Sequence, residues 1–224
     1  MSPTLIDTKL GRDYLGRHFL LSVPTNRKAV TLTFDDGPNP RNTPSLLKLL
    51  DRKRITAHFF LVGRHLARHG SIARETVAAG HEVGNHTYHH IPLTLLPSRV
   101  IRKELVETEK LLDEIAPGRM HTVRPPMGWF SQRVMNRFRD LDLIPVMGDV
   151  YPQDPGRPGV DTIVRRVRAR IGPGSIVILH DGGWRDGVDR SQTIDAVDRL
   201  TDELGAEGYS FESLSALCDG GELE

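Results

Sequence analysis

Strand-like and helix-like patterns alternate six or seven times along the 224 residues, and this alternation limits the possible folds more than any other feature of the chain. The predicted strands are rich in β-branched and aromatic residues and cover residues 30–34, 56–62, 82–85, 122–124, 144–147, 175–180 and 209–211. Between them, apolar residues recur at helical spacing. The alternation predicts an α/β protein with a parallel sheet, because right-handed crossovers bring the C-terminal end of every strand to the same side.

Polar residues cluster just after several of these strands. They are Asp35, Asp36, His86, Arg124, Asp154 and His180. A closed barrel brings such positions together at one mouth, whereas an open doubly wound sheet leaves the outer ones far apart. We therefore predict a distorted (β/α) barrel of about seven parallel strands in a single domain. We expect residues 29–216 to form the catalytic barrel, 1–28 to pack on it, and 217–224 to be a C-terminal tail.

Charge and composition exclude several classes of function. Lys and Arg total 30 against 29 Asp and Glu, so the chain lacks the basic surface of a nucleic-acid binder, and we expect a neutral substrate instead. The single cysteine, Cys218, excludes an internal disulfide. No apolar run approaches the ~20 residues that span a bilayer. Residues 1–12 lack the apolar centre of a secretory signal, so the chain as written is expected to be cytoplasmic, or secreted if a targeting segment was removed. We also expect a monomer.

The first predicted strand ends in two adjacent carboxylates, Asp35 and Asp36, followed by Gly37 and Pro38, which stop any regular element. Neighbouring side chains in a strand point to opposite sides, so the two acids have different roles unless the turn re-aims one of them. Adjacent carboxylates repel each other and are costly to bury, which favours a cation beside them. Read alone, however, such a sequence is more often an acidic turn that caps a helix.

His86 and His90 are a candidate pair of metal ligands. Histidines four residues apart in a helix-like turn can present two imidazoles to one ion, and Asp36 completes a His, His, carboxylate set with open positions for water and substrate. Spacing alone does not exclude His89, and a histidine-rich turn on its own is more often surface polarity. Because two imidazoles favour a softer ion than Mg²⁺ or Ca²⁺, we predict a divalent metal, Zn²⁺ first, with Co²⁺ or Ni²⁺ as alternatives.

Arg124 opens a stiff segment that continues through two prolines to Met127 and Gly128. Prolines fix the backbone and Gly128 permits a close approach, so the segment can aim a main-chain N–H at a ligand. The guanidinium of Arg124 can hold a carboxylate with two hydrogen bonds. The alternative is a surface salt bridge worth ~1 kcal/mol or less.

His180 ends the strand 175–180 and is placed for proton transfer near neutral pH, although a core histidine with satisfied nitrogens fits the same position. Asp154 can orient this imidazole, but an aspartate between prolines is at least as typical of a turn. Trp184 can stack on a sugar ring or cover the barrel rim. None of these residues identifies a function by itself.

Taken together, these residues resemble the polysaccharide deacetylases, the family four carbohydrate esterases named after the nodulation deacetylase. The resemblance runs from about residue 30 to 214, with five motifs in the family's order, and the ordered set is highly specific. The segment 33–38 matches the motif that supplies the base and a metal ligand, which implies Asp35 as general base and Asp36 as ligand. Residues 86–90 match the histidine motif, which implies His86 and His90 as ligands and His89 as a bystander.

The other motifs imply further roles. Arg124 would restrain Asp35, the backbone N–H of Met127 would join the oxyanion site, His180 would be the general acid, and Ile178 would contact the acetyl methyl. Met127 stands where the family usually has an aromatic residue, which alters the groove wall but not the backbone donor.

The fourth motif departs most from the family pattern. Asp154 matches the aspartate that orients the catalytic histidine, but Tyr151 replaces the preceding acid, and Gly148 and Pro155 stand where tryptophans are common. These changes affect the expected shape of the acetyl pocket more than the metal chemistry. The substrate-binding candidates are Ile178, Trp184 and Tyr151.

The resemblance implies a metal-dependent hydrolase that removes N-acetyl groups from GlcNAc-containing poly- or oligosaccharides, of the chitin-oligomer or peptidoglycan type, and releases acetate. Three alternatives stay open: an amidohydrolase of the same fold that acts on a small non-sugar amide, an O-acetyl xylan esterase, and a carbohydrate-binding protein without catalysis. The retention of Asp35 argues against the first of these.

Overall fold

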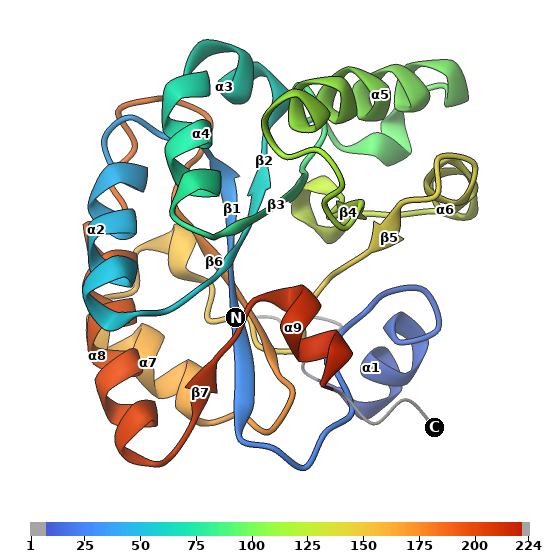
Figure 1. The fold of residues 1–224 in the computed structure, drawn as a ribbon. Helices are drawn as coiled ribbons and strands as arrows, with labels where there is room; N and C mark the ends of the chain where they lie inside the picture. The colour runs from blue at the N-terminus through green and yellow to red at the C-terminus, as the bar shows by residue number, and fades with distance from the viewer. Residues whose placement is uncertain (1–7, 221–224) are drawn as a thin grey trace.

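The computed structural model describes residues 8–220, which form a seven-stranded parallel sheet surrounded by helices (Figure 1). The strands are β1 (Ala29–Gly37), β2 (His58–Leu61), β3 (Glu82–Asn85), β4 (Thr122–Val123), β5 (Ile144–Pro145), β6 (Ile176–His180) and β7 (Ser210–Phe211). Their order is β5-β4-β3-β2-β1-β6, and β7 pairs with the start of β1. The predicted α/β fold with a parallel sheet in a single domain is confirmed.

The barrel is distorted where β5 and β6, the two ends of this order, approach each other. Isolated parallel bridges stand there in place of a ladder: Leu20 of the N-terminal segment pairs with Val146, and Val150 pairs with Val177 of β6. The N–H of Ile178 donates to the carbonyl of Val150 at 2.8 Å. The segment that follows β5 therefore crosses to β6 and closes the barrel.

Helices cover the outside of the sheet. They are α1 (Lys9–Leu15), α2 (Thr43–Lys53), α3 (Gly63–Arg68), α4 (Gly70–Ala78), α5 (Ser98–Ile115), α6 (Gln132–Arg139), α7 (Val160–Arg168), α8 (Ser191–Ala206) and α9 (Leu214–Asp219). Short 3₁₀ turns are η2 (Leu93–Leu95), η3 (Pro126–Gly128) and η4 (Asp154–Gly156). In Figure 1, α2, α7 and α8 stand together on one side of the sheet, with α5 and α6 on the other. No described helix is long and apolar enough to cross a membrane.

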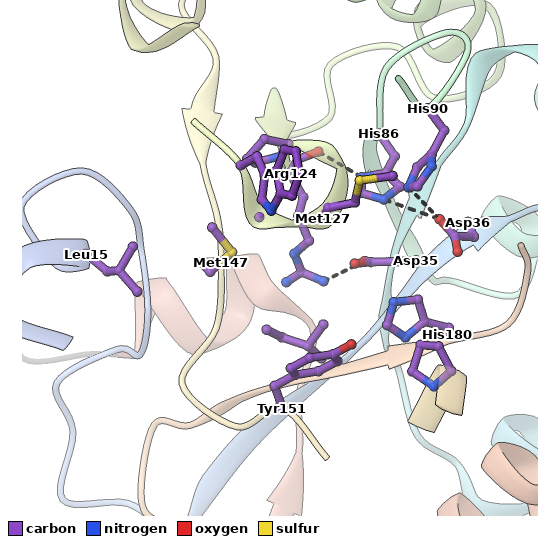
Figure 2. Close-up of a pocket in the computed structure, with 15 residues that line it drawn as sticks. Leu15, Asp35, Asp36, His86, His90, Arg124, Met127, Met147, Tyr151 and His180 are labelled. Atoms are coloured by element: carbon purple, nitrogen blue, oxygen red, sulfur yellow. Dashed lines mark hydrogen bonds and ion pairs between the residues drawn. The ribbon is translucent and has the colours of Figure 1, made fainter. Parts of the chain in front are cut away.

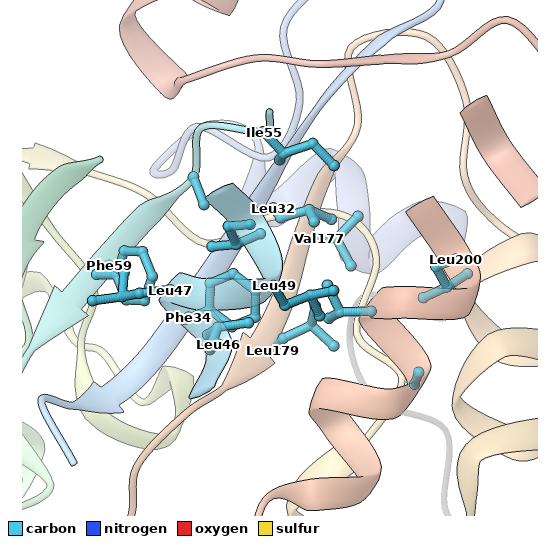
Figure 3. Close-up of a cluster of buried hydrophobic side chains, with 14 of the residues drawn as sticks. Leu32, Phe34, Leu46, Leu47, Leu49, Ile55, Phe59, Val177, Leu179 and Leu200 are labelled. Carbon is cyan, nitrogen blue, oxygen red and sulfur yellow. The ribbon is translucent and has the colours of Figure 1, made fainter. Parts of the chain in front are cut away.

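The main core lies between the sheet and the helices α2, α7 and α8 (Figure 3). Leu32 and Phe34 of β1 point into this core, whereas Thr33 and Asp35 point into the barrel. This two-residue alternation is a property of any strand, and it fixes which carboxylate enters the barrel mouth. Burying the apolar face of β1 therefore also positions Asp35.

The N-terminal segment packs on the barrel through a second cluster of buried side chains. Leu15, Phe19 and Leu21 join Met147 and Ile178 in this cluster. Residues 1–7 lie outside the described residues, so the predicted domain boundary near residue 28 stays a prediction.

The helix α9 runs across residue 216, where we expected the barrel to end, and its Leu217 is fully buried. The carboxylate of Glu82 accepts hydrogen bonds from the N–H groups of Leu214 and Ser215 at the start of this helix. Three residues of the expected tail, 217–219, therefore belong to a packed helix. Residues 221–224 lie outside the described residues.

Candidate active site

The end of β1 separates two adjacent carboxylates. Asp36 has a positive φ of 73°, and the pairing with β2 shifts register between Asp35 and Gly37. Because of this irregularity, the side chain of Asp36 points toward the barrel mouth, as that of Asp35 does. The two carboxylates have different partners there. Asp35 pairs with Arg124, and Asp36 lies beside His86 and His90. The turn therefore redirects the side chain of Asp36, so the two acids do not point to opposite sides as neighbouring strand residues usually do. The sequence had left this exception open.

Asp36, His86 and His90 form a compact group of metal-donor atoms. The Oδ1 atom of Asp36 lies 3.4 Å from Nε2 of His86 and 3.0 Å from Nε2 of His90, and the three donor atoms all lie within 4.8 Å of one another. The two histidines do not stand on the helix-like turn that we predicted, since Thr87 and His90 both have positive φ. The irregular loop after β3 brings the two rings together instead, with ring centroids 4.9 Å apart.

Hydrogen bonding orients this group toward a cation. Nδ1 of His86 donates to the carbonyl of Arg124 at 2.7 Å, which leaves the lone pair of neutral His86 on Nε2, facing Asp36. Burial alone would raise the pKa of Asp36, but the neighbouring His86 and His90 hold it well below its usual range. The buried Oδ1 of Asp36 has no hydrogen-bond partner among the described residues. An anionic oxygen and two imidazoles whose donor atoms converge fit a divalent metal.

His89 is turned away from this group. Its Nδ1 lies 2.7 Å from Oε1 of Glu104, and its main-chain N–H donates to the other oxygen of the same carboxylate. The structure therefore separates His89 from the two histidines that flank it in sequence.

Arg124 links the two halves of the site. Its Nη1 donates to Oδ1 of Asp35 at 2.6 Å and to the hydroxyl of Thr33 at 2.8 Å. The guanidinium lies 4.1 Å from the ring centroid of Phe60, and only 2% of Arg124 is exposed. This is a buried ion pair rather than the surface salt bridge that the sequence also allowed. The prediction that Arg124 holds a carboxylate fits this contact, although only Nη1 reaches Asp35.

His180 faces the pocket from the end of β6. Its Nδ1 lies 3.0 Å from Oδ1 of Asp154, and its N–H donates to Oδ2 of the same residue. Thr193 also donates to Oδ2 of Asp154, which is buried. Burial alone would lower the pKa of His180, but the carboxylate of Asp154, followed by those of Asp36 and Asp35, raises it to about 9. His180 is therefore an imidazolium at neutral pH, with Nε2 free to donate.

One pocket of about 530 Å³ is lined by Asp35, Asp36, His86, His90, Arg124 and His180 (Figure 2). Tyr151 and Ile178 line it, as does Met127, whose φ of 59° and half-exposed side chain place it at the rim. Trp184 does not line the pocket. It is 63% exposed and lies edge-on to His90 and under the guanidinium of Arg64.

Sequence reasoning missed four residues of this region, one of which is Trp129 at the pocket rim. Leu15 and Met147 line the pocket, and no local pattern marked either of them. Asp181 is fully buried beside the Asp36–Gly37 turn and accepts a hydrogen bond from the Thr43 hydroxyl. Burial, and then the nearby Asp36 and Asp35 carboxylates, raise the pKa of Asp181 to about 7. Its only sequence signal was its position directly after His180.

Comparison with known proteins identifies the family. Residues 22–146, more than half of the chain, match the polysaccharide deacetylase family. The chitooligosaccharide deacetylase of Sinorhizobium fredii (strain NBRC 101917 / NGR234) is 36% identical over 206 residues, covering 88% of this chain and 96% of the relative. The peptidoglycan-N-acetylglucosamine deacetylase of Bacillus cereus (strain ATCC 14579) is 33% identical over 197 residues, covering 87% and 90%.

The fold comparison agrees. The crystal structure of the Bc1960 peptidoglycan N-acetylglucosamine deacetylase superposes with a TM-score of 0.86 at 27% identity, covering 95% of this chain and 98% of that one. The chain belongs to the polysaccharide deacetylase family. The predicted membership and the predicted class of hydrolase are confirmed.

Proposed function

We propose that this protein removes N-acetyl groups from GlcNAc-containing oligo- or polysaccharides, of the chitin-oligomer or peptidoglycan type, and releases acetate. The observation that carries the proposal is the arrangement of three groups around one pocket: the Asp35 carboxylate held by Arg124, the His180 imidazole held by Asp154, and a metal-donor set beside both. Relatives named for chitooligosaccharide and for peptidoglycan N-acetylglucosamine support this substrate class.

Asp36, His86 and His90 would hold the divalent metal, and the two imidazoles favour Zn²⁺ over Mg²⁺ or Ca²⁺. When bound, such an ion polarises the substrate carbonyl and lowers the pKa of a water ligand from 15.7 toward roughly 7. The second nitrogen of His86 is already engaged by the carbonyl of Arg124, which fixes the ring that would bind the ion.

Asp35 and His180 would move the two protons of the reaction. Asp35 takes a proton from the attacking water, and its ion pair with Arg124 keeps it aimed at the pocket. His180 gives a proton to the nitrogen that leaves, a role that its raised pKa of about 9 supports. Asp154 positions that imidazole. The main-chain N–H of Met127 would donate to the developing oxyanion, and such a donor can contribute about 3 kcal/mol.

The remaining predicted residues would contact the substrate. Ile178 would face the acetyl methyl, and Tyr151 the sugar beside it, because both line the pocket. Trp184 would meet a sugar unit outside the pocket, since it is exposed next to His90. All of these groups come from one chain, which supports a monomer as the active unit.

The proposal is tested by acetate release from chitin oligomers and from peptidoglycan. Asp35→Asn should remove nearly all turnover and leave the bound metal in place, because Asp35 is not among the donor atoms. Asp142→Asn, at an exposed position, is the matched control. Acetate release by Asp35→Asn at the wild-type rate would refute the role of Asp35.

A chelator test separates an enzyme from a carbohydrate-binding protein. EDTA should abolish acetate release, and zinc should restore it. Metal that binds the folded state also stabilises it, by about 2.7 kcal/mol at a hundredfold excess over Kd, so the melting temperature should fall with EDTA as well. Sugar binding that survives EDTA without any acetate release would favour the binding protein. Turnover of cyclic ureides would favour the amidohydrolase of small non-sugar amides. Turnover of acetylated xylan alone would favour the O-acetyl xylan esterase.

A further inference from the structure

The pocket extends well beyond the groups that the proposed deacetylation uses. Asp36, His86 and His90 lie at one end in Figure 2, and Leu15 lies at the opposite end, with Met147 between. We call the second half the apolar arm. It is lined by Leu15, Pro125, Met127, Trp129, Met147 and Ile178.

Burial deepens along the apolar arm. Met127 and Trp129 are 50% and 53% exposed and form its mouth, whereas Leu15 and Met147 are 3% and 6% exposed and form its floor. The floor belongs to the packed cluster that includes Phe19 and Ile178, so its walls are part of the core. The arm is therefore a recess with a fixed apolar end and not a feature of the surface.

We propose that the apolar arm accepts N-acyl groups longer than acetyl, so that the enzyme deacylates glucosamine carrying short alkyl acyl chains. This inference rests on the proposed function. Ile178, which would face the acetyl methyl, is itself a wall of the arm. A water molecule occupies about 30 Å³ in the liquid, and a methyl group is of comparable size, so the acetyl methyl fills only a small part of the 530 Å³ pocket.

An alkyl chain suits this space better than a second sugar does. The polar side chains that line the pocket are the catalytic and donor groups together with Tyr151, and none of them belongs to the floor formed by Leu15 and Met147. Sugar hydroxyls placed there would lose their hydrogen bonds to water without replacement. Alkyl groups make no hydrogen bonds to water, so they lose none when they are buried. The thioethers of Met127 and Met147 can also adapt to chains of different length.

The chemistry is the same hydrolysis. The oxygen of water bonds to the acyl carbon, the carbon–nitrogen bond breaks, and the nitrogen takes the proton, which gives a carboxylic acid and a free amine. The arm changes only which acyl group is held during these steps.

The test uses the metal-loaded enzyme and chitotriose carrying N-acetyl, N-propionyl, N-butyryl or N-hexanoyl groups, with release of free amine as the readout. Each buried methylene should raise kcat/KM by up to about fourfold until the arm is full. If the enzyme hydrolyses the acetyl substrate but has a hundredfold lower kcat/KM for the butyryl substrate, the inference is overturned and the proposed function is left intact. Absence of acetyl hydrolysis would instead refute the proposed function.

Two variants test whether the apolar arm determines the preferred length of the acyl chain. Leu15→Phe shortens the floor and should lower the butyryl-to-acetyl ratio of kcat/KM at least tenfold, whereas Leu15→Ala should move the preferred chain to a longer one. Leu21→Phe is the matched control, because Leu21 lies in the same buried cluster but does not line the pocket. Since these readouts are ratios, a loss of folded protein does not imitate them. Equal ratios in all three variants would overturn the inference.

Discussion

Arg124 holds Asp35 inside the barrel through an Nη1–Oδ1 contact of 2.6 Å, with both side chains almost fully buried. Removing the guanidinium would leave a buried carboxylate without its counter-charge, which costs about 3–5 kcal/mol. We expect Arg124→Ala to lower the free energy of unfolding by that amount and acetate release by at least a hundredfold. Urea denaturation and a turnover assay measure the two effects.

Arg124→Lys separates charge from geometry in the same pair. Lysine keeps the positive charge but lacks the planar group that also reaches Thr33 and lies against Phe60. Stability should recover in part while acetate release stays low. A lysine variant with wild-type turnover would contradict a positioning role for the guanidinium.

The contact between Asp154 and His180 predicts a change in pH dependence. The nearby carboxylates raise the pKa of His180 to about 9, so the protonated, donating form persists up to that pH and is lost above it. Asp154→Asn removes the strongest of these negative charges, so the pKa should fall. The alkaline limb of the kcat profile should move to lower pH by at least one unit, measured at saturating metal. An unchanged limb would show that another group sets it.

His81 predicts a pH-dependent stability that has nothing to do with catalysis. Burial lowers the pKa of His81 to about 4, from an ordinary value near 6.5, and its Nδ1 accepts the N–H of Ala57. The unfolded chain therefore binds a proton that the folded state does not bind between these pH values. Stability from this group is present above pH 6.5 and falls as the pH drops toward 4, by about 3 kcal/mol in total.

His81→Asn should flatten that part of the pH profile, because asparagine keeps an acceptor but does not titrate. Chemical denaturation at intervals between pH 4 and 7 provides the comparison. Parallel profiles for the wild type and His81→Asn would contradict the assignment.

Much of the fold could be predicted because the spacing of apolar residues in strands and helices follows from their burial. The burial of one face of β1 in the core also determines which of its side chains point into the barrel. The convergence of Asp35, Arg124 and His180 follows from the same rule, since each stands at or just after the C-terminal end of a parallel strand. The resemblance added the expected roles, which the residue pattern alone left open.

The features that sequence reasoning missed depend on backbone geometry or on distant contacts. The positive φ of Asp36 and His90 is unusual for residues with side chains, and although Asp and His adopt it more often than most residues, their identity alone does not indicate it. The barrel seam closes through backbone bridges at Leu20 and Val150, which leave no side-chain pattern. Leu15 reaches the pocket only because the N-terminal segment folds back on the barrel, so local periodicity could not place it.

Gly182 sits against the backbone of Asp36, the carboxylate that we propose as a metal donor. A Cβ atom at this position would lie 2.0 Å from the carbonyl oxygen of Asp36 and 2.3 Å from its carbonyl carbon. Backbone cannot yield as a flexible side chain can, so Gly182→Ala should displace Asp36 from His86 and His90. We expect weaker zinc binding in calorimetry and a loss of turnover of about a hundredfold, the scale associated with a displacement of about 1 Å in an active site.

Gly183→Ala is the control, one residue further on. There the atoms nearest to a Cβ atom would be side-chain atoms of Arg190 and Val188, at 3.3 Å, and no backbone atom lies as close as at Gly182. Zinc affinity and turnover should stay close to those of the wild type. Equal losses of zinc affinity and turnover in both variants would mean that this loop tolerates no side chain at all. Wild-type zinc affinity and turnover in both would show that a displacement of Asp36 does not impair the site. Only a loss confined to Gly182→Ala supports a donor position held by close backbone packing.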